Sequence, residues 1–262
     1  MRHLVGAALI AFSQPAAAQA IAIPFAPPTD RALVYQIEQH RPVDGTTRRF
    51  SATRDLRFER AGEGYILQAT LKAIDTDAPA AGAESYRAAL TPLVGVVLRF
   101  RLDGQGHIVS LDAMDQMWTT VQASLSAMLA QFAPDTPRHK AAAKVQALFD
   151  SLSPEGRLGL LAGEMQPLFL FSGSSVAGGE GRGLRTVAGS PLGRPVPVEG
   201  TLRVVAQPAD ALDLEEKLAG TGVQVAIRYR LSRTTGLVET QQRSLAVGSL
   251  ALTESRTLTP AD

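Results

Sequence analysis

Apolar and polar residues alternate along the first third of the chain, the pattern of β-strands that bury one face. In the clearest run Phe50, Ala52, Leu56 and Phe58 share a face opposite charged and hydroxyl side chains. The dipeptide Asp44-Gly45 between two such runs is typical of a tight hairpin. We therefore expect an antiparallel meander with one solvated face, formed by strands over 31–41, 46–60, 64–74, 98–102 and 107–111.

The hydrophobic period changes at Asp112 from two residues to between three and four, which predicts a helix. Two further helices are expected over 137–151 and from Ser153 to about 167, the latter with serine at the cap and proline in the first turn. A short helix over 84–94 is also compatible with the pattern, after a loop over 76–83. The apolar stripe of the first long helix consists of Met114, Met117, Trp118, Val121, Leu125, Met128, Leu129 and Phe132.

The segment 172–200 is rich in glycine and proline and predicts a loop or a linker between β layers. Alternating runs return over 201–258. Because the strands are separated from the helices along the chain, the pattern predicts an α+β fold. We expect one mature domain over 21–262, in which a strongly curved antiparallel sheet of about nine strands packs on an inserted layer of about three helices.

The first twenty residues have the three parts of a secretory signal peptide. Arg2 provides the positive charge, Leu4–Phe12 form an apolar run, and Ala18-Gln19-Ala20 fits the cleavage rule. The alternatives are a short buried helix or a membrane anchor, but nine residues in a helix span only about 14 Å. We expect cleavage after Ala20 and export, to the periplasm if the source is a diderm bacterium. The remaining chain has no apolar run long enough to span a membrane.

Composition excludes several classes of site. The chain has no cysteine, which rules out disulfides, thiolate nucleophiles and thiolate metal sites. Lys plus Arg number 26 against 25 Asp plus Glu, and Arg2 is lost with the predicted signal. This balance argues against a nucleic-acid partner, which requires a basic surface.

No catalytic or cofactor motif stands out. His40, His107 and His139 share no metal-binding spacing. The glycine-rich run 178–183 lacks the Lys-Ser/Thr and the helix start of a phosphate loop, and 173–177 ends in alanine where a nucleophile elbow needs glycine. We expect no enzyme, no cofactor and no metal.

Two features are candidates for a ligand site. The stripe from Met114 to Phe132 carries three of the five methionines and the only tryptophan. Methionine suits a surface that accepts varied apolar partners, although such a stripe is also typical of an ordinary core. Arg54 interrupts the apolar face of strand 46–60, so it either holds an anionic group, pairs with an interior carboxylate or marks a bulge. The candidate ligand residues are Met114, Met117, Trp118, Val121, Leu125, Met128 and Arg54.

The order of elements resembles the uncharacterised secreted β-meander proteins of bacteria. The resemblance lies in LRFRLDGQGHIVSLD (98–112), PLGRPVPVEGTLRV (191–204) and IRYRLSRTTGLVET (227–240), which combine strands with Asp-Gly or Thr-Gly turns. That family has no established activity, so the resemblance implies no catalytic residues. The expected architecture is also similar to the half-barrels of periplasmic lipoprotein carriers, which shield acyl chains, but a shared fold does not fix function.

Three hypotheses follow for function. The first is a non-enzymatic envelope protein that binds a lipid or another apolar or amphiphilic molecule between the sheet and helix 113–132. The second is a structural or protein-interaction module of the envelope, which uses a sheet edge or the segment 172–200. The third is a hydrolase whose residues converge only in three dimensions.

Overall fold

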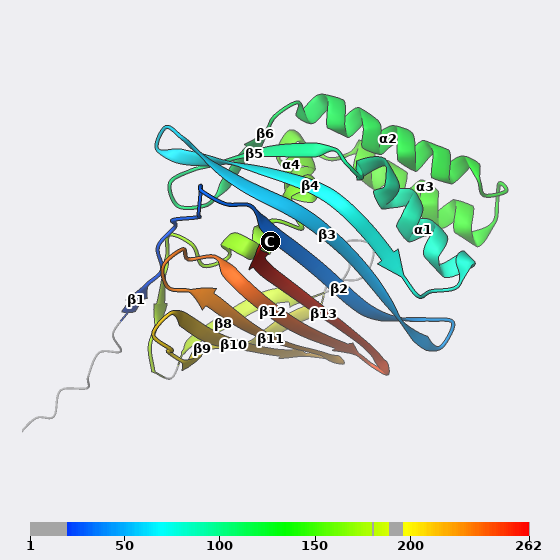
Figure 1. Ribbon diagram of the computed structural model, residues 1–262. Coiled ribbons are helices and arrows are strands. Elements are labelled where there is room, and N and C mark those ends of the chain that lie inside the picture. The colour runs from blue at the N-terminus through cyan, green and yellow to red at the C-terminus, as the bar shows by residue number, and fades with distance from the viewer. Residues whose placement is uncertain (1–19, 180, 189–195, 262) are drawn as a thin grey trace, which may run out of the picture.

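The computed structural model describes residues 20–179, 181–188 and 196–261. The predicted signal peptide lies outside the described residues, apart from Ala20. The described chain is α+β, as predicted. Figure 1 shows a long, twisted antiparallel sheet that curves around part of the helical segment, with the remaining helices at one end.

The main sheet has eleven strands in the order β6-β5-β4-β3-β2-β13-β12-β11-β10-β9-β8. β2 pairs with β13, so strands from the two ends of the chain meet in the middle of the sheet. A separate pair joins β1 (Ala20–Ala22) to β7 (Ser175–Ala177). The strands of the main sheet are β2 (Leu33–Val43), β3 (Thr46–Ala61), β4 (Gly64–Thr76), β5 (Val97–Leu102), β6 (Ile108–Leu111), β8 (Arg182–Ala188), β9 (Val196–Ala206), β10 (Ala211–Gly220), β11 (Val223–Ser232), β12 (Val238–Val247) and β13 (Leu250–Pro260).

Local signals place several boundaries correctly. Asp44 and Gly45 both have positive φ, 50° and 77°, as a two-residue hairpin turn requires, and this confirms the turn between β2 and β3. The Ser153 hydroxyl accepts a hydrogen bond from the Gly156 amide at 3.2 Å, which confirms the predicted helix cap.

The described residues form four α-helices: the three expected between the strands and a fourth that overlaps the short helix allowed over 84–94. The additional helix, α1, begins at Ala80 within the predicted loop 76–83, because Pro79 occupies the cap position and alanines follow it. The helices are α1 (Ala80–Leu90), α2 (Met114–Ala130), α3 (Pro137–Asp150) and α4 (Pro154–Ala162), with 3₁₀ turns η1 (Thr91–Leu93) and η2 (Gln166–Phe169).

The prediction of a loop over 172–200 is wrong for much of that segment, which contains β7, β8 and the start of β9. β8 is an edge strand whose residues are mostly exposed, so it lacks the alternation that identifies a half-buried strand. Residues 180 and 189–195 lie outside the described residues.

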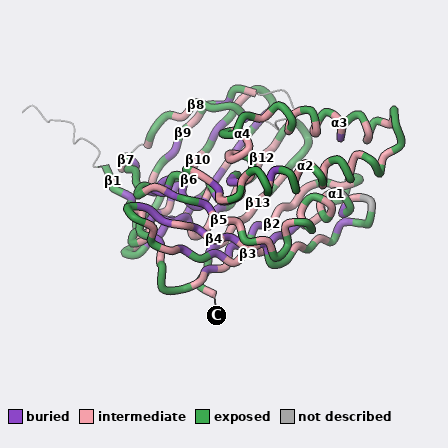
Figure 2. Tube along the Cα trace, turned by 90° about the horizontal axis from the view of Figure 1, so that it is seen from above, coloured by how far each residue is buried: buried purple, intermediate pink, exposed green. Residues whose placement is uncertain are grey.

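The core is divided between the two halves of the sheet. In one half, α4 and η2 cover the inner face of β2–β6 with Ala162, Met165, Leu168 and Phe169. In the other half, Phe171 and the β9–β12 side chains form a second cluster. Figure 2 shows that α2 and α3, in contrast, are mostly exposed or half-buried, and Trp118 is the one buried residue of α2. Apart from the first turns of α2, the α2–α3 pair therefore stands away from the core.

Candidate functional site

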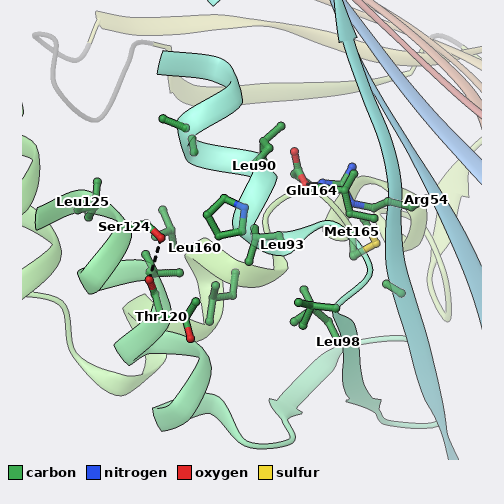
Figure 3. A pocket seen from close by; sticks show the side chains of 18 of the residues that line it. Arg54, Leu90, Leu93, Leu98, Thr120, Ser124, Leu125, Leu160, Glu164 and Met165 are labelled. Atoms are coloured by element: carbon green, nitrogen blue, oxygen red, sulfur yellow. Dashed lines mark hydrogen bonds and ion pairs between the residues drawn. The ribbon is translucent and has the colours of Figure 1, made fainter. Parts of the chain in front are cut away.

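A cavity of about 350 Å³ lies between the inner face of the sheet and the helices (Figure 3). Its floor is formed by inward-facing residues of β4 and β5, namely Ala69, Leu71, Leu98 and Phe100. The volume falls in the range of small-molecule pockets, about 300–1,000 Å³. The other walls are formed by Ala88, Ala89, Leu90, Pro92, Leu93, Val96, Thr120, Val121, Ser124, Leu125, Met128, Phe149, Leu160, Leu161 and Met165.

The sequence explains why this space is open. Strand alternation turns Ala69 inward, where its methyl group fills little of the gap between sheet and helix. On α2 the residues Val121, Leu125 and Met128 follow at helical spacing and line the cavity, and all three are half-buried. On α4, Leu160 is 43% exposed and marks an opening to solvent.

Arg54 and Glu164 are the only charged residues among the described residues that line the cavity. The Arg54 guanidinium donates through Nη2 to Oε2 of Glu164, which follows α4. The Arg54 side chain is 6% exposed and that of Glu164 is 44% exposed. Arg54 is thus an inward arginine paired with a carboxylate, one of the alternatives that its position allowed.

A shift of register also occurs at this point of the sheet. The β4 partner of Thr53 is Ala73 and that of Arg54 is Leu71, so one residue of β4 bulges. The bulge does not change the face of β3, because Ala52, Arg54 and Leu56 are all buried.

A hydrogen-bond network fixes the backbone of Glu164. Its carbonyl oxygen accepts from Arg256 Nη1 at 2.9 Å and from the Tyr35 hydroxyl at 3.3 Å. Burial raises the pKa of Tyr35, which keeps this hydroxyl protonated as a donor. Arg256 is in turn held by Glu254, whose Oε1 accepts from Arg256 Nε at 2.6 Å. The two central strands, β2 and β13, therefore position the acidic partner of Arg54.

The structure divides the predicted ligand residues into two groups. Arg54, Val121, Leu125 and Met128 line the cavity. The stripe does not lie along this cavity over its whole length. The residues that do not line the cavity lie nearer the start of α2: Met114 and Met117 pack against the core under α4, and Trp118 is buried, stacked on Phe149 at 5.6 Å with the Arg157 guanidinium over its ring.

Sequence reasoning missed the floor and the far wall of the cavity. The alternation in 64–74 and 98–102 does indicate that Ala69, Leu71, Leu98 and Phe100 face inward, so this signal was present. Glu164 gave no comparable signal, because its partner lies 110 residues away in the sequence.

The polar groups that line the cavity are few: two hydroxyl groups and the Arg54–Glu164 ion pair. Its two hydroxyls are used within α2, where Ser124 donates to the Thr120 carbonyl at 3.0 Å and Thr120 to the Gln116 carbonyl at 3.2 Å. None of the residues that line it is a histidine. The described ranges contain no group of three or more metal-ligating side chains, and none of their helices is both long and apolar enough to cross a bilayer.

Comparisons of the chain with protein-family models and with curated proteins, and of its structure with solved structures, found no match.

Proposed function

We propose that this protein is an exported, non-enzymatic carrier that shields an apolar chain in the cavity between the sheet and α2. The observation that carries the proposal is a cavity of about 350 Å³ whose lining is apolar except for two helix hydroxyls and one ion pair. Moving apolar surface from water into such a site is favourable by about 25 cal/mol per Å². Export is supported by the signal pattern in residues 1–20.

The proposal is tested with the purified protein lacking residues 1–20 and the apolar dye 1-N-phenylnaphthylamine. We expect dye fluorescence to rise on binding and to fall when long-chain methyl esters compete. Ser124→Trp places a large ring in the cavity and abolishes dye binding. Ala123→Trp is the control, since Ala123 is the exposed neighbour on α2 and does not line the cavity.

Equal dye binding by both tryptophan variants would place the bound dye elsewhere and remove the proposal. No dye binding by any form of the folded protein would also overturn it and favour an interaction module. The export part is tested separately by the mass of the secreted protein, which should correspond to a chain that begins at Ile21.

A further inference from the structure

We infer that the ligand of this cavity carries a neutral hydrogen-bond acceptor at its polar end, the carbonyl of an ester or amide, and that Arg54 binds it. This inference rests on the proposed function, because it names the chemistry of the molecule held in the same cavity. It distinguishes acylated neutral compounds from free fatty acids.

The first observation is an unsatisfied donor. Arg54 is 5% exposed, and its Nη1 is buried without a hydrogen-bond partner in the described part of the chain. A buried polar group that lacks a partner loses its hydrogen bonds to water and gains none in the protein, so such atoms are rare in folded proteins. Figure 3 shows the Arg54 side chain beside Glu164 and Met165 at the sheet side of the cavity. An acceptor atom on the ligand would provide the missing hydrogen-bond partner of Arg54 Nη1.

The second observation is the charge balance. Arg54 and Glu164 cancel one another, and no other charged residue of the described chain lines the cavity. A carboxylate brought beside Arg54 would add an uncompensated negative charge to an apolar site that already holds the Glu164 carboxylate. A carbonyl oxygen accepts from Nη1 and adds no charge.

The third observation is that Glu164 is held in place. Its backbone carbonyl is bound by Arg256 and Tyr35, which fixes the position of the Glu164 backbone beside Arg54. Met165 lines the cavity next to Glu164. Its unbranched, flexible side chain can change rotamer and allow a carbonyl to reach Nη1.

The test compares methyl decanoate with decanoate, above neutral pH and below their aggregation limits, as competitors of 1-N-phenylnaphthylamine. Arg54→Met removes the donor, and Arg57→Met is the matched control, because Arg57 is exposed on the opposite face of the same strand. We expect Arg54→Met to weaken methyl decanoate about tenfold, equal to about 1.4 kcal/mol, and Arg57→Met to leave its affinity unchanged.

Glu164→Gln supplies a second, opposite readout. Without the Glu164 charge, the buried guanidinium lacks a counter-ion, so decanoate should bind this variant at least about tenfold tighter than wild type. If Glu164→Gln does not fold, the comparison of Arg54→Met with wild type decides the inference. Arg54→Met is expected to fold, because it leaves only a half-exposed carboxylate without its partner.

The outcomes separate this inference from the proposed function. Failure of every competitor to displace the dye from wild type overturns the carrier function itself. Displacement by methyl decanoate with equal affinity for wild type and Arg54→Met overturns only the assignment of Arg54. Tighter binding of decanoate than of methyl decanoate to wild type overturns the neutral ligand.

Discussion

Glu164→Ala and Arg54→Met break the same ion pair, but we expect very different losses of stability. Glu164→Ala leaves a guanidinium that is 6% exposed without a counter-ion, and removal of one partner of a buried pair costs about 3–5 kcal/mol. Arg54→Met leaves a carboxylate that is 44% exposed and can be hydrated, while methionine joins the apolar lining. Its cost should stay below about 1 kcal/mol, the size of a surface pair.

Urea unfolding of the two variants and of the double variant gives these free energies directly. In a chain of this length, the loss in Glu164→Ala also lowers the melting temperature by about 6–20 °C. The double variant should unfold with nearly the free energy of Arg54→Met, since neither charge of this pair then remains. Arg57→Met controls for the loss of an arginine from β3. Equal losses for the two single variants would show that water already reaches Arg54, and would refute its description as a buried cation.

Three further predictions concern the cavity, a turn and a half-buried acid. Each methylene added to a methyl ester should tighten binding about fourfold, from about 0.8 kcal/mol per buried group, until the cavity is full; dye competition along a chain-length series measures this, and a flat series contradicts it. Gly236→Ala should lower the free energy of unfolding in urea by about 2 kcal/mol or more. Gly236 has a φ of 73°, and an added Cβ would clash with the Pro24 carbonyl oxygen. The control is Gly45→Ala, which should cost less because Gly45 has a similar φ but open space around it. Burial alone would raise the pKa of Glu254, but the hydrogen bond and charge of Arg256 hold this pKa below its ordinary 4.5. The carboxylate therefore contributes stability above pH 4.5, and this contribution is lost as the pH falls through the lowered pKa. Glu254→Gln should make the melting temperature fall less steeply at acid pH, and an unchanged acid profile would show that other groups control it.

The elements that sequence predicts well are those determined by neighbours in the chain. The Asp44-Gly45 turn, the Ser153 cap and the alternation of β3 each depend on a few consecutive residues. The segment 172–200 was misread because β8 forms at a sheet edge, where pairing with β9 creates a strand without a buried face. A strand whose residues are mostly exposed carries no alternation of apolar and polar residues by which the sequence could identify it.

The candidate site shows the same limit. The alternation of side chains along β3 predicts that Arg54 faces inward. Its partner Glu164 is positioned by hydrogen bonds from Arg256 and Tyr35, which join three segments that are distant in the sequence. The stripe on α2 identifies one face of a helix and does not say what each turn of that face meets. The first turns meet the core beneath α4, and only the later turns, from Val121 onward, meet the cavity.

The size of the cavity argues that it is more than imperfect packing. A closed void of 350 Å³ would cost about 8 kcal/mol at about 24 cal/mol per Å³, comparable with the whole stability of an ordinary domain, about 5–15 kcal/mol. The fold avoids that cost because the α2–α3 pair stands away from the sheet and leaves apolar side chains such as Leu160 partly in water. The exposure of these apolar side chains to water is also unfavourable, and an apolar ligand in the cavity would remove this free-energy cost. A guest at one hundred times its dissociation constant would add about 2.7 kcal/mol to the stability of the folded chain, so delipidation of the purified protein should lower its melting temperature.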